Sequence, residues 1–306
     1  MAAERKVTTL DVRRRKGREK LAVVTAYDAT MAALLDAAGL DILMVGDSLG
    51  MVVQGDDTTL GVTLSDMVYH CRAVTSCQPR AHVVCDLPFM SYQVSVEQAL
   101  TSAGVLLKQG RAEAVKLEGG VALAPTVRRL VEAGIPVMGH IGLTPQSVHQ
   151  MGGFRVQGRT SSAALELLED AQALEEAGAY AIVLEGMPSE AAAAITAAVG
   201  IPTIGIGAGP HTDGQVLVCY DLLGMYRGLA PKFVRHFAEL GDAVVRAGQA
   251  FAEEIRAGTF PAPEHTFAME RGQLPPQQST PESPADSAPT GPLAGQTSEP
   301  DPSLES

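Results

Sequence analysis

Short apolar runs alternate with helix-forming stretches along most of the chain. Between about residues 21 and 257 the apolar runs are separated by Ala-, Leu- and Glu-rich segments such as MAALLDAAG, VEQALTSAGVLLKQG and ALELLEDAQALEEAG. This alternation is typical of repeated βα units, in which a helix follows each buried parallel strand. Eight runs have the character of strands, at 21–27, 41–46, 81–86, 114–119, 136–142, 181–186, 201–207 and, from the weakest pattern, 216–224.

Eight strands in βα units predict an α/β protein with a (β/α)₈ TIM barrel. Periodicity alone does not show that the sheet closes, so an open, doubly wound sheet is the alternative. We expect one catalytic barrel domain over residues 1–269. Beyond about residue 260 the chain becomes rich in Pro, Ser, Thr, Gln and acids. Such a segment buries too little apolar surface to offset its ordering entropy, which predicts a disordered tail at 270–306.

The composition narrows the class of protein further. Hydrophobic residues make up 46% of the chain and aromatic residues 4%, with no Trp, which suits a large aliphatic core. The four cysteines contain no CxxC pair, which favours reduced thiols over a disulfide scaffold or a zinc site. Without a long apolar stretch or an apolar leader, we expect no membrane partner and a cytoplasmic location. The net charge of −12 disfavours nucleic acid as a partner, and the basic cluster at 13–20 predicts a solvated helix face.

Carboxylates end four of the apolar runs. Asp47, Asp86, Glu118 and Glu185 are separated by 39, 32 and 67 positions (86 − 47, 118 − 86 and 185 − 118), about one, one and two βα units. Because the C-terminal ends of barrel strands surround one mouth, we expect these acids to converge. Carboxylate oxygens with no cysteine nearby favour Mg²⁺ over zinc as the bound ion. Three of the acids can share this ion, which leaves the fourth free for proton transfer. His140 occupies the equivalent place in the fifth run.

Each of these residues also has a structural interpretation. A single Asp after a strand is commonly a helix cap or part of a buried salt bridge, and Ser48, which follows Asp47, would alone be an N-cap. A lone histidine at a strand end is often a satisfied structural residue. A functional site is therefore indicated by the occurrence of several acids together at the ends of different strands, and not by any one of them.

Longer motifs surround these strand ends: TAYDA at 25–29, VGDSLGMVVQGDDTTLGVT at 45–63, DLPFMSY at 86–92, VKLEGG at 115–120, GHIGLTPQSVHQMGGFRVQGR at 139–159, VLEGMP at 183–188 and IPTIGIGAGPHTDGQVLVCYDLLG at 201–224. With these motifs, the chain resembles the ketopantoate hydroxymethyltransferase family from about residue 23 to 267.

The resemblance implies a Mg²⁺-binding (β/α)₈ barrel that acts in pantothenate biosynthesis, the route to coenzyme A. It implies transfer of a one-carbon unit from 5,10-methylenetetrahydrofolate to 3-methyl-2-oxobutanoate, which gives 2-dehydropantoate. It also implies a homo-oligomer, a decamer. A 2-oxo acid presents its keto oxygen and one carboxylate oxygen as a chelate that suits a hard cation.

The resemblance also implies the roles of the site residues. Asp47, Asp86 and Glu118 are the metal residues, directly or through water, and Asp47 and Asp86, with Ser48 and Lys116, contact the oxoacid. Lys116 lies two positions before Glu118, so strand alternation places both side chains on the same face. We expect Glu185 to be the general base that removes a proton beside the ketone. His140 is a second-tier candidate that bonds the substrate or orients the metal residues.

Two glycine-rich loops carry weaker signals. GIGAG at 205–209 resembles a phosphate loop, but it has no Lys, Arg or Ser, which favours a tight turn. The loop at 151–159 is a candidate lid or folate contact, with Arg155 and Arg159 facing the acidic tail of the folate. This second expectation rests on charge complementarity alone.

Two other functions compete with this interpretation. Another Mg²⁺-dependent barrel acting on oxoacids, of the phosphoenolpyruvate mutase and isocitrate lyase kind, would use similar acids, although no cysteine here lies in the Lys- and Gly-rich loop of the lyase branch. A non-catalytic barrel used for assembly is the other possibility. It predicts eroded mouth residues, whereas every one is present in this sequence.

Overall fold

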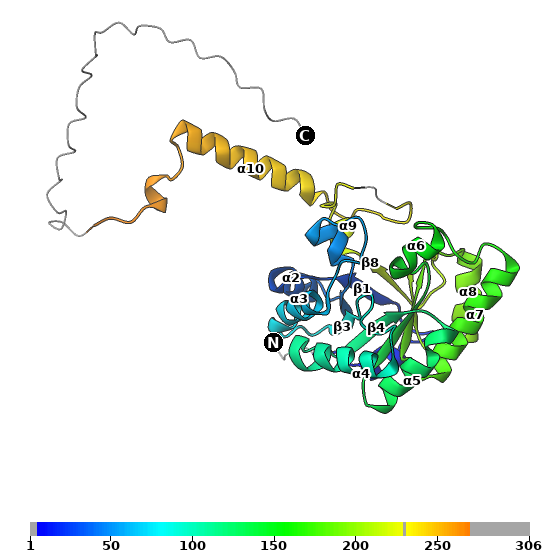
Figure 1. Ribbon diagram of the computed structural model, residues 1–306. Helices are drawn as coiled ribbons and strands as arrows, with labels where there is room; N and C mark the ends of the chain where they lie inside the picture. Colours follow the sequence, from blue (N-terminus) through cyan, green and yellow to red (C-terminus); the bar gives the residue numbers. More distant parts are fainter. Residues whose placement is uncertain (1–4, 229–230, 270–306) are drawn as a thin grey trace, which may run out of the picture. The chain divides into compact units, whose positions relative to one another are not determined.

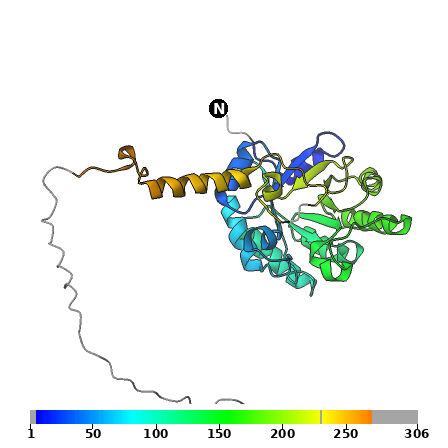
Figure 2. The ribbon, with the colours of Figure 1, turned by 90° about the horizontal axis from the view of Figure 1, so that it is seen from above.

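The computed structural model describes residues 5–228 and 231–269. Eight parallel strands close into a barrel in chain order, with β1 paired to both β2 and β8 (Figures 1 and 2). The strands are β1 (Leu21–Thr25), β2 (Ile42–Val45), β3 (His82–Asp86), β4 (Ala114–Glu118), β5 (Val137–Gly142), β6 (Ala181–Glu185), β7 (Thr203–Ile206) and β8 (Gly214–Leu217). The predicted (β/α)₈ barrel is confirmed, and the open doubly wound sheet is excluded.

The eighth strand differs from its predicted range of 216–224. It begins at Gly214, where an added Cβ would lie 2.7 Å from the Leu21 carbonyl oxygen, so the close approach of β1 requires glycine. The strand ends at Leu217, and the chain continues into the short helix α9 (Cys219–Leu222). The backbone N–H of Cys219 donates to the Thr25 hydroxyl at 3.0 Å instead of to a neighbouring strand. The prediction was therefore wrong beyond Leu217, because a side chain of β1 replaces the strand partner there.

Helices lie on the outside of the barrel between successive strands (Figure 1). Four of these helices are preceded by an Asp, Ser or Thr whose side chain accepts a hydrogen bond from the backbone N–H three residues later in the chain. This hydrogen bond stabilises the first turn of the helix. The main outer helices are α2 (Ala29–Ala37), α3 (Leu64–Ser76), α4 (Val96–Val105), α5 (Ala124–Glu132), α7 (Ser161–Glu176) and α8 (Ser189–Ala198). The shorter segments are α1 (Thr9–Arg14), α6 (Val148–Met151), the π-turns η1 (Gly50–Gln54) and η2 (Leu106–Gly110), and the 3₁₀ turns η3 (Val121–Leu123), η4 (Pro145–Ser147) and η5 (Pro263–His265).

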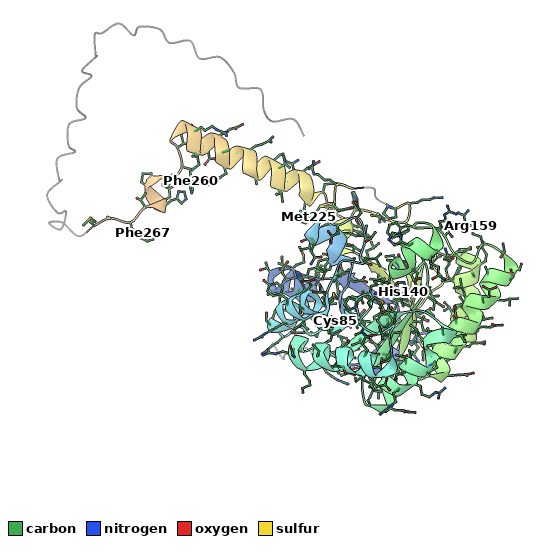
Figure 3. The ribbon with its side chains drawn as sticks, in the orientation of Figure 1. Cys85, His140, Arg159, Met225, Phe260 and Phe267 are labelled. Atoms are coloured by element: carbon green, nitrogen blue, oxygen red, sulfur yellow. The ribbon has the colours of Figure 1, made fainter. Side chains whose placement is uncertain are left out.

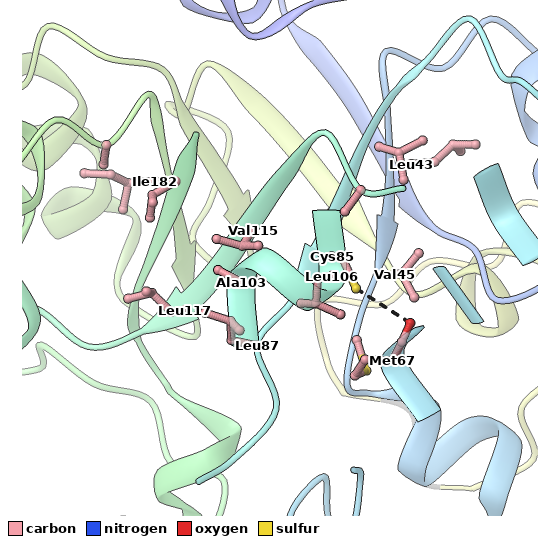
Figure 4. Packing of buried hydrophobic residues seen from close by; sticks show 14 of the residues in the cluster. Leu43, Val45, Met67, Cys85, Leu87, Ala103, Leu106, Val115, Leu117 and Ile182 are labelled. Atoms are coloured by element: carbon pink, nitrogen blue, oxygen red, sulfur yellow. Dashed lines mark hydrogen bonds between the residues drawn. The ribbon is translucent and has the colours of Figure 1, made fainter. Parts of the chain in front are cut away.

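The apolar core has two layers, because alternate residues of each strand point to opposite faces. The outer layer packs the barrel against its helices, and Figure 4 shows Leu43, Val45, Val115 and Leu117 among the side chains that fill it. The inner layer fills the lumen with the alternate positions of the same strands, including Ile42. The lumen is therefore a packed core, and its polar residues lie at the strand ends.

The N-terminal segment packs against the end of the barrel where the strands begin, which we call the bottom. Val7 and Val12 join the luminal core there. Arg15 pairs with Asp41 at 2.9 Å, and Lys16 pairs with Asp213 at 2.9 Å. The prediction of a solvated basic cluster was thus wrong for these two cations, because acids at the strand starts neutralise them.

The chain divides into two compact units, residues 1–250 and 251–306. Helix α10 (Leu240–Ala257) buries none of its residues, and the exposed side chains of Leu240, Val244, Phe251 and Ile255 recur at helical spacing. In the second unit the Phe260 ring lies 5.5 Å from that of Phe251. The predicted disordered tail at 270–306 lies outside the described residues. No helix within 5–228 or 231–269 is both long and apolar enough to cross a bilayer.

Candidate active site

Strand alternation brings five polar side chains to the end of the barrel where the strands finish, which we call the mouth. Asp86 is the last residue of β3 and stands in register with Lys116 of β4. Glu118 ends β4 and stands in register with His140 of β5. Glu185 ends β6. Figure 3 shows His140 among the barrel strands.

Asp47 follows β2 by two positions and lies beside Asp86. The Oδ2 atom of Asp86 accepts a hydrogen bond from the backbone N–H of Asp47 at 3.1 Å and lies 3.2 Å from the ammonium of Lys116. The Oδ1 atom of Asp86 is buried and has no hydrogen-bond partner. One oxygen of this carboxylate is thus fixed by the protein, and the other is left without a donor.

Glu118, His140 and Glu185 form a second group in the mouth. His140 lies between the two glutamates, with Nδ1 at 3.4 Å from Glu118 Oε1 and Nε2 at 3.2 Å from Glu185 Oε2. The Nε2 atom is not aligned for a hydrogen bond to Glu185. The Lys116 ammonium lies 3.3 Å from His140 Nδ1 and so connects the two groups. The side chain of Glu185 is 16% exposed, against 3% for Glu118 and His140, so Glu185 is the acid most accessible from solvent.

The charges in the mouth are only partly balanced. Burial, together with the charges of Asp86 and Glu118, raises the pKa of Asp47 to about 8. Burial also raises the pKa of Asp86, although Lys116 opposes the shift. Burial acts to raise the pKa of Glu118, but the hydrogen bond and charge of His140, the charge of Lys116 and the Gln146 N–H together lower it. Burial lowers the pKa of His140, but its contacts with the glutamates raise it to about 9.

The donors and charges of this cluster fit a hard divalent cation. Asp47 and Asp86 offer carboxylate oxygens, and the unpartnered Oδ1 of Asp86 is a buried acceptor that a cation would satisfy. No three side chains of the described residues already converge as a metal cluster. Mg²⁺ commonly takes one or two carboxylates and completes its shell with water and substrate oxygens. Asp47, Asp86 and Glu118 are the carboxylates that could hold such a cation.

Ser48 is held by a tyrosine that the sequence analysis did not single out. Its hydroxyl lies 2.8 Å from the hydroxyl of Tyr27. A Cβ on Gly46 would lie 2.8 Å from the Ser48 hydroxyl oxygen and 3.6 Å from Asp86 Oδ2. The absence of a side chain at position 46 therefore leaves room for Ser48 next to the acids.

Gln146 and Tyr92 also belong to the site, although neither was predicted from the sequence. The Gln146 amide donates to Asp47 Oδ2 at 2.8 Å, and its backbone N–H donates to Glu118 Oε2 at 3.0 Å. The Tyr92 hydroxyl lies 2.7 Å from Gln146 Oε1. Both residues lie in loops beyond strand ends, where the sequence has no periodicity that would indicate which side chains point inward. The one sequence feature that could have identified them is their position within the long motifs that resemble the family.

The glycine-rich loops remain outside this cluster. Arg155 and Arg159 are exposed, and nearby Phe154 is half exposed at 51%; Figure 3 shows Arg159 at the outside of the molecule. The loop is tied to the mouth by a 2.8 Å hydrogen bond from the Gln157 N–H to the carbonyl of Gly186, the residue after Glu185. The structure therefore places the loop near the acid site and leaves its expected folate contact untested.

Comparison with solved structures supports the architecture. A 2,3-dimethylmalate lyase, described as a member of the phosphoenolpyruvate mutase and isocitrate lyase superfamily, aligns with a TM-score of 0.55 over 87% of this chain and 91% of its own. The sequence identity is 18%, so this likeness concerns the fold alone.

Comparison with sequences is more specific. Two proteins named 3-methyl-2-oxobutanoate hydroxymethyltransferase are closely similar to the chain. The one from Syntrophobacter fumaroxidans is 55% identical over 86% of this chain and 94% of its own length. The one from Nitratidesulfovibrio vulgaris is 53% identical over 88% of each. The family model for ketopantoate hydroxymethyltransferase matches residues 6–263. Nearly the whole barrel is covered by this match, and the chain belongs to the ketopantoate hydroxymethyltransferase family.

Proposed function

We propose that this protein is a 3-methyl-2-oxobutanoate hydroxymethyltransferase. It transfers a one-carbon unit from 5,10-methylenetetrahydrofolate to 3-methyl-2-oxobutanoate and forms 2-dehydropantoate, the first step towards pantothenate. The observation that carries the proposal is identity of 53–55% to relatives of that name over most of both chains. The convergence of acids at the mouth supports it, because this chemistry needs a cation site and a separate base.

Mg²⁺ is the cofactor of this proposal. Asp47, Asp86 and Glu118 would hold it, directly or through water, together with oxygens of the oxoacid. When bound, the cation would neutralise charge that develops on the keto oxygen. Lys116 lies beside Asp86 and supplies a fixed positive charge for the oxoacid. Ser48 contributes a hydroxyl to bind the substrate carboxylate.

Glu185 is the general base. It removes the proton from the carbon next to the ketone, and its greater exposure relative to Glu118 supports access to substrate. His140 lies 3.2 Å from this carboxylate and is the second-tier candidate that bonds the substrate or orients the metal residues. The resulting carbon nucleophile bonds to the methylene carbon of the folate donor once the first of that carbon's two bonds to folate nitrogen has opened. The second carbon–nitrogen bond then breaks and water supplies the hydroxyl group, while the two folate nitrogens take up the protons released by the oxoacid and by water. The net reaction consumes one water and releases tetrahydrofolate.

A folate-dependent assay tests the proposal. Purified protein should consume 3-methyl-2-oxobutanoate only when the folate donor and a divalent cation are present, and a chelator should abolish turnover. Glu185→Gln should lower kcat by roughly 10²- to 10³-fold, as expected for loss of a general base, while Mn²⁺ affinity is retained. Turnover of an isocitrate-like substrate in place of 3-methyl-2-oxobutanoate would instead favour the lyase function.

The remaining expectations about partners are part of the same proposal. Arg155 and Arg159 contact the acidic tail of the folate, and double replacement by Ala should raise the KM for folate more than that for the oxoacid.

The protein forms a homo-oligomer, and the exposed apolar stripe of α10 supports this because such a surface is typically covered by a partner. Light scattering of the full chain measures the assembly, with a decamer expected. A cytoplasmic location and the absence of a nucleic-acid partner stay predictions.

A further inference from the structure

The side chain of Gln146 connects the ends of neighbouring strands at the mouth. Gln146 belongs to η4, is 6% exposed, and makes four hydrogen bonds through its amide. The Nε2 group donates to Asp47 Oδ2 at 2.8 Å and to the Leu87 carbonyl at 3.0 Å. The Oε1 atom accepts from the Tyr92 hydroxyl at 2.7 Å and from Gln93 Nε2 at 3.1 Å. The amide thus donates two hydrogen bonds and accepts two, which satisfies its full hydrogen-bonding capacity.

Tyr92 fixes which end of the amide faces Asp47. The Tyr92 hydroxyl accepts the backbone N–H of Glu118 at 3.1 Å, and its own proton goes to the shorter of its remaining contacts, Gln146 Oε1. Turning the amide by 180° would place its oxygen against the Asp47 carboxylate and the Leu87 carbonyl, two acceptors that it cannot bond. The amide therefore has one favourable orientation, with its donors towards Asp47.

The chemistry of an amide suits this position better than that of a cation. Gln146 provides the one hydrogen bond that the Asp47 side chain receives from the part of the chain that the structure describes. It fixes Oδ2 and leaves Oδ1 without a donor. A lysine or arginine there would bring a positive charge that competes with a metal ion, whereas a neutral amide orients the Asp47 carboxyl group without adding charge. The Gln146 backbone N–H fixes Glu118 from the same turn.

We propose that Gln146, oriented by Tyr92, is a positioning residue that holds the Asp47 and Glu118 carboxylates in the geometry required to bind a divalent cation. The inference rests on the metal site of the proposed function. It adds residues that bind neither metal nor substrate and act through the carboxylates. Groups that orient metal ligands in this way typically account for about 10- to 100-fold in metal affinity.

Mn²⁺ binding to the full chain, without substrate, tests this role. Gln146→Met keeps the length of the side chain and removes its donors, so the dissociation constant for Mn²⁺ should rise by roughly 10- to 100-fold. Gln215→Met is the matched control, because the Gln215 amide also donates to two protein oxygens, the Gly209 carbonyl and the Thr212 hydroxyl, but at the start of β8. The control should leave Mn²⁺ affinity unchanged.

Tyr92→Phe gives an independent test. It keeps Gln146 and removes the hydroxyl that orients the amide, so Mn²⁺ affinity should fall by about 10-fold, the lower end of the same range. If Gln146→Met does not fold, this variant decides the question. Wild-type affinity in the folded variants, with only a lower melting temperature, would show that Gln146 serves packing and would overturn the inference while leaving the proposed activity intact. Failure of the wild-type protein itself to bind Mn²⁺ would overturn the metal site and this inference together.

Discussion

The two ends of the barrel both carry buried carboxylates, but among the described residues the buried carboxylate oxygen without a hydrogen-bond partner lies at the mouth, on Asp86. At the bottom, Asp213 accepts hydrogen bonds from Lys16, from the N–H of Gly17 and from the N–H of Thr203, each at 2.9 Å. Burial alone would raise its pKa, but these hydrogen bonds lower it. At the mouth, Asp86 has an unpartnered oxygen, and its pKa is raised.

The contrast separates Asp213, whose hydrogen bonds stabilise the fold, from Asp86, which keeps an open acceptor. A carboxylate whose pKa is lowered binds its proton less tightly in the folded protein, so its ionisation favours folding. A buried carboxylate whose pKa is raised has the opposite effect, and such carboxylates cluster at functional sites. In barrels of this type the mouth carries function and the bottom carries stability. Substitutions at the two ends should therefore change different observables.

The largest expected effect is the loss of activity on substitution at the mouth. Asp86→Asn keeps the shape of the side chain but removes a ligand of the cation, whose charge neutralisation is worth several kcal/mol in the transition state. We expect kcat/KM to fall by roughly 10³-fold or more. The melting temperature should stay the same or rise, because a buried, incompletely partnered charge is removed. Steady-state kinetics and a thermal melt of the same sample measure both effects.

A large loss of stability in Asp86→Asn would contradict the contrast between the two ends. It would show that Asp86 serves the fold as Asp213 does. Unchanged turnover with unchanged stability would remove Asp86 from the proposed cation site.

The second effect is a loss of stability on substitution at the bottom. Asp213→Asn removes a charge that accepts from Lys16 and from backbone donors, and hydrogen bonds to charged groups are worth about 2 kcal/mol each. We expect the free energy of unfolding to fall by about 2 kcal/mol, with kcat of the folded protein unchanged. Urea unfolding gives the stability, and Glu166→Gln on the exposed face of α7 is the control, with an expected change below about 0.5 kcal/mol. A fall in kcat without a fall in stability would mean that the bottom takes part in function.

The sequence predicted the acids of the mouth more completely than those of the bottom. Asp86, Glu118 and Glu185 each end an apolar run, and a polar residue at that point is visible from the pattern alone. Asp213 lies before a strand of four residues, where the apolar run is too short to mark its position. Its partner Lys16 is 197 positions away in the chain, so only the closed barrel brings the two together.

The supporting residues of the site were harder to predict for a similar reason. Gln146 and Tyr92 lie in loops, and their inward orientation depends on how the loops cross the strand ends. A glutamine in a loop is usually solvated, and no spacing distinguishes one that contacts Asp47. The sequence therefore predicted the strands and the acids that meet at the mouth, whereas the neutral groups that hydrogen-bond to these acids required the structure.

A third, smaller effect is the response of stability to a divalent cation. Mg²⁺ should bind the folded protein through Asp47 and Asp86 and compensate the charges left unbalanced at the mouth. At a concentration ten times its dissociation constant, a ligand specific for the folded state stabilises it by about 1.4 kcal/mol. Thermal melts with Mg²⁺ and with a chelator should differ for the wild-type protein and for Asp213→Asn, but not for Asp86→Asn. An equal shift in all three would indicate binding elsewhere.

The smallest effect is the dependence of the free energy of unfolding on pH in the acid range. It isolates what the carboxylates at the bottom of the barrel contribute to stability. The pKa of Asp213 is lowered from its ordinary value of 3.8, and its ionised form therefore stabilises the folded state. This contribution is complete above the unfolded pKa and is lost as the pH falls through the lower, folded pKa. Unfolding by urea at a series of pH values below about 5 should thus show a steeper loss of stability in the wild-type protein than in Asp213→Asn, which has no carboxylate to protonate. Glu113 has a lowered pKa as well, since hydrogen bonds from His82 and Lys6 outweigh its burial, so part of the slope should remain in the variant. Parallel slopes in the two proteins would show that Asp213 is as easily protonated in the folded chain as in the unfolded one, and the difference between the two ends of the barrel would then rest on geometry alone.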